Sequence, residues 1–367
     1  MEAAPERVAD EVLDELRRRL RATRWVDLPR GVGWERGTDA GFLAELVDAW
    51  ADSYDWRPHE DRIRALPWCS LAAPAGRAVH QRGARDPGTP AVVLLHGWPD
   101  SVLRFERLLP LLGDLDVVVP ALPGFPFAPP LTEPGMSTTA MADAVAAWMA
   151  ELGYDRYVVS GGDIGSSVAE ALAAAHPERV AAVHLTEVTY RHLLAATAAP
   201  AGLDAEALAF LDELRRWQAT EGAYAHEQAT KPHSLAPALG DSPAGLAAWL
   251  VEKLRRWSDC DGDLEAVFAR DDLLTWITAY WVGGTIGTSF SPYFEPDAPV
   301  GPVTAPTVVT IFPRDLLRAP RSLGERHFDI RRWDEPAAGG HFGAWEQPEA
   351  YAESLRAALA LADEAAA

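Results

Sequence analysis

Short apolar runs alternate with helical patterns over residues 91–185, and this alternation limits the possible folds more than any other feature of the chain. The runs are too short to be helices, and turns rich in Gly and Pro lie close to them. They cover residues 91–95, 116–119, 157–160 and 180–185, with helices expected at about 138–152 and 166–175. Strands that alternate with helices form a parallel sheet with right-handed crossovers. The sequence therefore predicts an α/β fold.

The strand pattern stops near residue 190 and resumes at 307–312 and, more weakly, at 330–333. Between these points we expect helices at 203–220, 243–257 and 271–282, and an alanine-rich helix closes the chain at 348–361. The predicted segments are an N-terminal helical module (1–88), the first part of the core (89–190), a helical cap (191–300) and the second part of the core (301–367).

The N-terminal module has two apolar stripes at helical spacing, punctuated by prolines that exclude one long helix. The first stripe is Val8, Val12, Leu16 and Leu20, and the second is Phe42, Leu46, Val47 and Trp50. Residues 72–90 are rich in Ala, Gly, Pro and Arg, and are expected to form a loop or a weak strand.

Charge and cysteine usage exclude several classes of partner. The chain has 33 basic and 54 acidic residues, a net charge of −21, which argues against nucleic acid and anionic membranes as partners. No apolar run reaches the length of a membrane helix, and residues 1–10 lack the apolar core of a secretory signal. Cys69 and Cys260 have no metal-ligand spacing. We expect a cytoplasmic bacterial protein with no metal and no cofactor.

The segment from Gly161 to Gly165 carries the main chemical signal. An apolar run enters Gly161-Gly162-Asp163-Ile164-Gly165 and a helix follows, which is the pattern of a nucleophile elbow with Asp at its centre. Small residues must flank such a sharp turn, and the central side chain is presented at the carboxyl ends of the strands. The alternative is an Asp that only caps the helix, a common arrangement.

Two more residues follow in the order that an α/β-hydrolase fold uses: nucleophile, acid, histidine. Asp315 comes just after the strand expected at 307–312, and His341 lies in Gly339-Gly340-His341-Phe342 before the final helix. Backbone amides after the first core strand and after the nucleophile would form the oxyanion hole. The candidates are the amides of Trp98 and Ile164, with His96 as a structural turn residue.

With these motifs in place, the chain resembles the epoxide hydrolases of the α/β-hydrolase superfamily, in the microsomal-type branch with its own N-terminal module. The resemblance covers about residues 14–351 and is carried by Arg24-Trp25, Gly33-Trp34, Tyr54-Asp55-Trp56-Arg57, Ala65-Leu66-Pro67, His96-Gly97-Trp98-Pro99, Leu122-Pro123-Gly124-Phe125, Gly161-Gly162-Asp163, Tyr280-Trp281, Phe312-Pro313 and Gly339-Gly340-His341-Phe342. Two features depart from it. Ile164 stands where the family usually has Trp, and no clear strand pair precedes His96.

The resemblance implies two tyrosines in the helical cap, Tyr224 and Tyr293, that donate hydrogen bonds to the epoxide oxygen. Opening the ring releases an alkoxide, a poor leaving group that needs such a donor. The alternative is that both rings only pack. Four other tyrosines are expected to pack: Tyr54, Tyr154, Tyr157 and Tyr280.

Together these residues predict an enzyme that converts a hydrophobic epoxide and water to a vicinal diol, through an ester on Asp163 that His341 and Asp315 hydrolyse. A homodimer is expected from the resemblance. Three alternatives stay open: a dehalogenase, an epoxide-opening cyclase or isomerase, and a silent binding module. Ile164 supplies no halide donor, and the complete set of Asp163, Asp315 and His341 disfavours a silent module.

Overall fold

A computed structural model describes residues 3–29, 31–83 and 89–364. One mixed sheet of eight strands runs through the core, in the order β1-β2-β4-β3-β5-β6-β7-β8. The strands are β1 (Trp68–Leu71), β2 (Gly76–Gln81), β3 (Ala91–Leu95), β4 (Val117–Pro120), β5 (Tyr157–Gly161), β6 (Val180–Leu185), β7 (Pro306–Thr310) and β8 (Asp329–Asp334). Strands β3 to β8 are parallel to one another, and β1 and β2 are antiparallel. This architecture confirms the predicted α/β-hydrolase fold.

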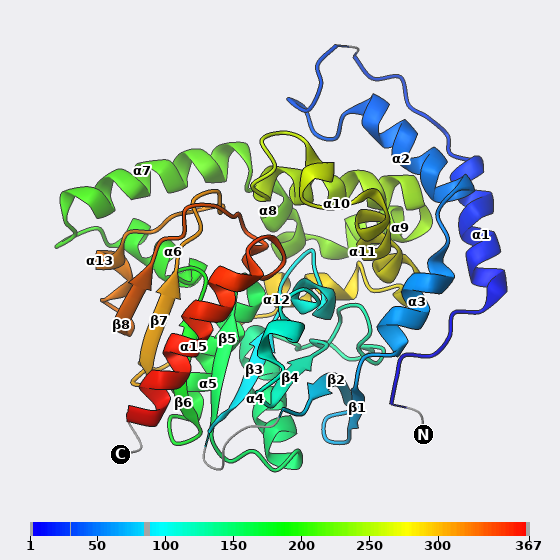
Figure 1. The fold of residues 1–367 in the computed structure, drawn as a ribbon. Helices are drawn as coiled ribbons and strands as arrows, with labels where there is room; N and C mark the ends of the chain where they lie inside the picture. The colour runs from blue at the N-terminus through cyan, green and yellow to red at the C-terminus, as the bar shows by residue number, and fades with distance from the viewer. Residues whose placement is uncertain (1–2, 30, 84–88, 365–367) are drawn as a thin grey trace.

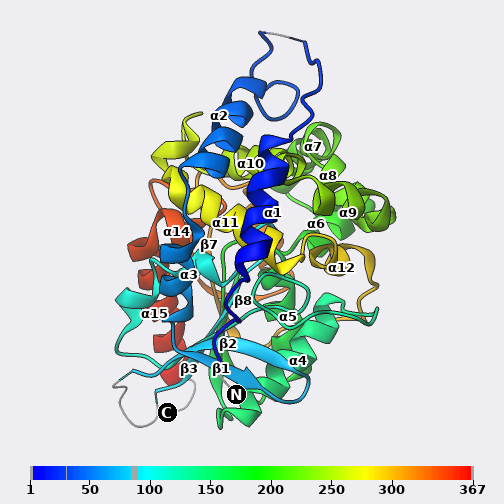
Figure 2. The same cartoon turned by 90° about the vertical axis from the view of Figure 1, so that its right-hand side faces the viewer.

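Helices cover both faces of the sheet (Figures 1 and 2). Helices α4 (Thr138–Glu151) and α5 (Ile164–Ala175) lie on one face, and α15 (Pro348–Glu364) lies on the other. The central strands β3, β4, β5 and β6 are buried along their whole length, which explains why their sequences are continuous apolar runs rather than alternating ones. Each of these runs lies within one or two residues of its predicted bounds.

The edge before β3 corrects the sequence analysis, because a clear strand pair is present there. Strands β1 and β2 form a hairpin in which Trp68 pairs with Val79, and His80 of β2 pairs with Val118 of β4. The hairpin depends on tertiary contacts that local sequence does not reveal. For example, Trp148 of α4 donates its indole N–H to Pro74 O at 2.7 Å. Part of the expected loop, residues 84–88, lies outside the described residues.

The chain between β6 and β7 is helical and lies above the carboxyl ends of the parallel strands (Figure 1). We call its helices the cap helices: α6 (Tyr190–Ala198), α7 (Ala205–Thr220), α8 (Ala223–Thr230), α9 (Pro232–Asp241), α10 (Pro243–Trp257), α11 (Arg270–Gly283) and α12 (Ser291–Phe294). The sequence predicted α7, α10 and α11. It missed the shorter ones, which have too few turns for an apolar period to stand out.

The N-terminal helices α1 (Asp10–Arg21), α2 (Ala40–Asp52) and α3 (Trp56–Arg64) pack along the outer side of the cap helices (Figure 1). Helix α1 buries Leu13, Leu16 and Leu20, whereas Val12 is exposed, so the predicted stripe is wrong at that position. In α2, Leu46, Val47 and Trp50 are buried as predicted, and Phe42 is partly buried.

The remaining short elements are α13 (Arg321–Gly324), α14 (Gly343–Glu346) and four 3-10 turns at Val102–Phe105, Leu109–Leu112, Leu264–Ala266 and Thr288–Phe290. Within the described residues, each helix is either too short or too polar to span a bilayer.

Candidate active site

Asp163 lies at a sharp turn between β5 and α5. Its φ of +57° and ψ of −129° are unusual for a residue with a side chain, and such strain concentrates at functional sites. The glycines around it allow the close approach. A Cβ at Gly161 would lie 2.2 Å from Gly165 O, and one at Gly97 would lie 2.4 Å from Asp163 Oδ1. The elbow therefore depends on space that only glycine leaves.

The Asp163 carboxylate has two partners that suit a nucleophile. The Trp98 amide donates a hydrogen bond to Asp163 Oδ1 at 2.8 Å, and His341 Nε2 lies 3.4 Å from Oδ2. The side chain makes no capping hydrogen bond to α5, so the alternative of a simple cap does not describe it. Ile164 begins α5, where backbone N–H groups have no partner within the helix.

His341 and Asp315 are brought together from two loops at the carboxyl edge of the sheet. His341 Nδ1 lies 2.8 Å from Asp315 Oδ1, and the Leu316 amide donates to the same oxygen at 2.6 Å. The His341 amide donates to Trp257 O at 2.8 Å, which ties its loop to cap helix α10. The imidazole thus has Asp315 on one nitrogen and Asp163 near the other.

Opposing effects act on the His341 imidazole. Burial lowers its pKa, but the neighbouring Asp315 and Asp163 carboxylates raise it by more, to about 10. The two carboxylates therefore favour the protonated ring at neutral pH. Esterification of Asp163 would remove one of the two anions that stabilise the imidazolium, and so would favour the neutral ring that a general base requires.

The two predicted tyrosines lie beside this site. The ring of Tyr224, on α8, stacks on Trp98 at a centroid distance of 5.3 Å, and Tyr293, on α12, lies 6.2 Å from Tyr224. The Tyr293 hydroxyl is buried with no hydrogen-bond partner in the protein. Burial raises the pKa of both phenols well above the usual range, so both keep their protons. Tyr280, expected to pack, is buried and donates to Asp100 O at 3.0 Å.

A buried ion pair beneath the site was not predicted from the sequence. Arg104 Nη1 contacts Asp100 Oδ2 at 2.6 Å, and both side chains are buried. Asp100 also accepts from the Gly97 amide at 2.7 Å, while Arg104 donates to His341 O. The pair therefore links the loop that carries the Trp98 amide to the loop that carries His341.

Glu187 is a second residue that the sequence analysis missed. It comes two residues after β6, at the same edge of the sheet as Asp163 and Asp315, which is a signal that could have found it. Ligand atoms of Glu187, Asp315 and His341 lie within 4.8 Å of one another. Burial, followed by the charges of Asp163 and Asp315, raises the pKa of Glu187 to about 7.

This cluster has the residue types of a metal site, but one oxygen of each carboxylate is already in a hydrogen bond. Asp315 already binds His341 Nδ1, and Glu187 is in hydrogen-bond contact with Ser166 Oγ. The arrangement therefore fits acid–base chemistry better than metal binding.

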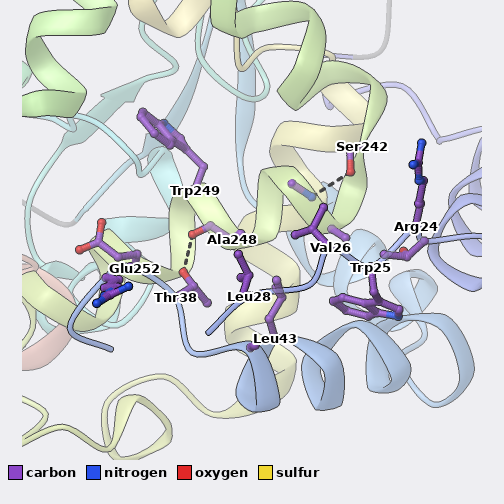
Figure 3. Close-up of a pocket in the computed structure, with 16 residues that line it drawn as sticks. Arg24, Trp25, Val26, Leu28, Thr38, Leu43, Ser242, Ala248, Trp249 and Glu252 are labelled. Carbon is purple, nitrogen blue, oxygen red and sulfur yellow. Dashed lines mark hydrogen bonds between the residues drawn. The ribbon is translucent and has the colours of Figure 1, made fainter. Parts of the chain in front are cut away.

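A separate groove of about 600 Å³ lies between the N-terminal segment and cap helix α10 (Figure 3). Trp25, Val26 and Leu28 line one side, and Ala248 and Trp249 line the other. It contains none of the predicted site residues. The candidate active site lies instead at Asp163, where a residue with a strained backbone has its carboxylate beside a histidine and a backbone donor.

Comparisons with known proteins show which families the chain matches. Residues 2–105 match the family described as "Epoxide hydrolase N terminus", and residues 90–225 match the "alpha/beta hydrolase fold" family. A protein assigned as an epoxide hydrolase in Stigmatella aurantiaca is 35% identical, over 95% of this chain and 82% of the relative. Epoxide hydrolase 1 of Sus scrofa is 27% identical, over 97% of this chain and 88% of the relative.

Solved structures show the same similarity over nearly the whole chain. The juvenile hormone epoxide hydrolase of Bombyx mori has a TM-score of 0.86 and 25% identity, covering 99% of this chain and 95% of its own. The epoxide hydrolase of Aspergillus niger has a TM-score of 0.85 and 25% identity, covering 98% and 96%. The chain therefore belongs to the epoxide hydrolases of the α/β-hydrolase fold, in the microsomal-type branch that carries the epoxide hydrolase N-terminal domain.

Proposed function

We propose that this epoxide hydrolase acts in two steps through a covalent ester on Asp163. In the first step, a carboxylate oxygen of Asp163 attacks an epoxide carbon and the ring C–O bond breaks. Tyr224 and Tyr293 donate hydrogen bonds to the ring oxygen, and one of them supplies the proton that converts the alkoxide to a hydroxyl. The phenols are suited to this role because burial keeps both protonated.

Before the second step, the proton of the His341 imidazolium passes to the phenolate that ring opening leaves, so the phenol is restored and the imidazole is neutral. Neutral His341 then removes a proton from water, which attacks the ester carbonyl. The amides of Trp98 and Ile164 stabilise the oxyanion of the tetrahedral intermediate. As the intermediate collapses, the bond from the former Asp163 carbonyl carbon to the alkyl oxygen breaks, and the departing oxygen takes the proton held by His341 to complete the diol. Asp163 is left as a carboxylic acid, and its proton returns to His341, which restores the starting carboxylate and imidazolium. Asp315 orients the imidazole through the 2.8 Å contact with Nδ1.

The proposal depends on one observation: the two oxygens of the Asp163 carboxylate have different partners. Oδ1 accepts a hydrogen bond from the Trp98 amide, and Oδ2 lies near His341 Nε2. The Trp98 amide could therefore donate to the carbonyl oxygen of the ester, which would be Asp163 Oδ1. His341 Nε2, beside Oδ2, is close enough to the ester to take a proton from the attacking water.

We further propose that the substrate is a hydrophobic epoxide. The Trp98 amide binds Asp163, and four aromatic rings pack around the Trp98 ring: Tyr224, Trp257, Phe290 and Tyr293. Such rings favour apolar substituents on the epoxide over charged ones. Styrene-type epoxides should therefore be turned over with a higher kcat/KM than epoxides that carry a carboxylate.

A single-turnover reaction in ¹⁸O-labelled water tests the covalent step. With enzyme in excess, the first diol should contain unlabelled oxygen from the Asp163 carboxylate, and the label should enter the enzyme. Diol that carries the label in its first turnover would show direct attack by water and would refute the mechanism.

A further inference from the structure

The mechanism above leaves Glu187 without a role, although it lies within the catalytic group. The residue follows β6, and Asp315 follows the neighbouring strand β7, so the two carboxyl groups approach His341 from adjacent strand ends. The side chain faces charge on several elements. The charges of Asp163 and Asp315 raise the pKa of Glu187, and that of His341 lowers it. The charge of Glu187 in turn raises the pKa of the Tyr224 and Tyr293 phenols.

The hydrogen bonds of Ser166 indicate which group holds a proton. Ser166 Oγ lies 2.7 Å from the backbone oxygen of Asp163 and is also in hydrogen-bond contact with Glu187 Oε1. A carbonyl oxygen and an ionised carboxylate only accept, and a hydroxyl has one proton to donate. Both contacts are satisfied if Glu187 is protonated, donates to Ser166 Oγ and leaves the serine proton for the Asp163 carbonyl.

The charge around Glu187 favours the same state. Full ionisation would place the carboxylates of Asp163, Asp315 and Glu187 around one imidazolium. Two carboxyl groups this close share a proton more readily than both ionise, and the one with fewer donors keeps it. Asp315 has two donors, His341 Nδ1 and the Leu316 amide.

We propose that Glu187 is a positioning residue for His341: it stays protonated while Asp315 is ionised, and it becomes the carboxylate partner of the imidazole when Asp315 is neutralised. This inference rests on the function proposed above. Asp315 and Glu187 then form a pair that holds one negative charge beside His341. Without the Asp315 charge, Glu187 is the carboxyl group that remains within 4.8 Å of the His341 ligand atom on the Asp315 side, so the positive imidazolium stabilises the ionised form of Glu187.

Four proteins test the pair: the wild type, Asp315→Asn, Glu187→Gln and the double variant. Each is mixed with an epoxide, and hydrolysis of the ester on Asp163 is followed by rapid quench and mass spectrometry of the intact chain. Loss of a triad carboxylate that has no substitute costs about 10⁴ in rate. We expect Asp315→Asn to lose only about 10–10², Glu187→Gln to lose less than about tenfold, and the double variant to lose about 10⁴.

Equal hydrolysis rates in Asp315→Asn and the double variant would overturn the inference. The same data separate this failure from failure of the proposed function, because ester formation does not use His341 or its partners. An ester that forms in all four proteins supports the two-step mechanism, and its absence from all four refutes that mechanism instead.

Infrared spectroscopy of the substrate-free proteins gives a second readout that a purely structural role would not affect. The wild type minus Glu187→Gln difference spectrum at pH 6 should contain the C=O band of a protonated carboxyl group. The band should be lost when the same pair is compared in the Asp315→Asn background, where Glu187 is ionised. A band that is absent at pH 6, or that persists in the Asp315→Asn background, would refute the proposal.

Discussion

His341 contacts both the nucleophile and the acid, but the proposed mechanism uses it only after the ester exists. Replacing His341 with Gln should therefore permit ring opening and block hydrolysis. We expect an adduct on Asp163, seen as an increase in the intact mass by the mass of the epoxide. Asp163→Ala is the control and should form no adduct. A folded His341→Gln protein that forms none would contradict this division of roles.

The two tyrosines should share the work of ring opening, because an ether oxygen has two lone pairs. A lost donor at a developing oxyanion costs about 10²–10³ in rate, and a surviving partner should reduce this loss. We expect Tyr224→Phe and Tyr293→Phe each to slow ester formation, and the double variant to be nearly inactive. Phe keeps the ring stacked on Trp98, so the loss reports the hydroxyl.

A haloalkane provides the control for the tyrosine variants, since halide leaves without a proton. Any residual dehalogenation should be insensitive to either hydroxyl. If all three variants form ester from the epoxide at the wild-type rate, the tyrosines only pack.

The raised pKa of His341 also predicts how stability depends on pH. The free imidazole has a pKa of about 6.5 in an unfolded chain, against about 10 in the folded enzyme. Between these values the folded state binds a proton that the unfolded state does not, so the free energy of unfolding falls as pH rises. Urea unfolding at pH 8, 9 and 10 should show this fall in the wild type and a weaker one in His341→Gln. Equal slopes would contradict the prediction. The window lies above pH 7, where Glu187 and Glu346 titrate.

The sequence predicted candidate residues that follow a strand within a strong motif, and the structure brings these together. It missed residues whose contacts depend on distant partners. Asp163, Asp315 and His341 each stand beside glycines or a strand end, which gives a local signal. Glu187 also follows a strand, but no neighbouring motif marks it, and its closeness to Asp315 arises only when β6 and β7 pair.

At the scale of elements, the elbow depends on how closely α5 approaches β3. A Cβ at Gly165 would lie 2.2 Å from Leu95 O, a backbone atom that cannot move aside. Overpacking of this kind typically costs about 1–3 kcal/mol. We expect Gly165→Ala to lower the free energy of unfolding by at least this amount, measured by urea denaturation, and to reduce ester formation.

Gly240 in α9 is the matched control, because a Cβ there would meet nothing within 4 Å. Gly240→Ala should be neutral or stabilising by about 0.4–1 kcal/mol. If the two variants have equal stability, the close approach at Gly165 is not a constraint on the fold.

The elements that could be predicted are those with a strong local period. The buried strands β3 to β7 were found because parallel sheets require continuous apolar runs. The β1–β2 hairpin was missed because half of its partners lie on β4 and α4, far along the chain. The short cap helices were missed for a different reason. Helices α6, α8, α9 and α12 have only 9, 8, 10 and 4 residues, too few turns for an apolar period to stand out.

At the scale of the whole molecule, the N-terminal helices and the cap form one packed unit. Trp50 of α2 is 1% exposed and donates its indole N–H to Thr278 Oγ1 of α11 at 3.0 Å. Tyr54 makes a similar contact with Thr275 Oγ1 at 2.9 Å. The cap helix that supports the site is therefore held from outside by the N-terminal helices.

Trp50→Ala should consequently lower the free energy of unfolding by about 3–5 kcal/mol, the usual cost of a buried Trp truncation. Hydrogen exchange should also quicken at the amides of α11. Trp25→Ala is the matched control: this side chain is 50% exposed, and the change should stay within about 0.5 kcal/mol. An unchanged stability of Trp50→Ala would show that the two regions are not energetically linked.

The hydrogen bond from the Trp98 amide to Asp163 has a consequence for how this enzyme can evolve. Its donor belongs to the main chain, so no substitution at position 98, other than proline, removes it. The Trp98 ring, in contrast, is a buried side chain that stacks on Tyr224, so a substitution at position 98 would change it. In one residue, therefore, the main-chain amide persists through almost any mutation, whereas the side chain can change and alter the aromatic surroundings of the site.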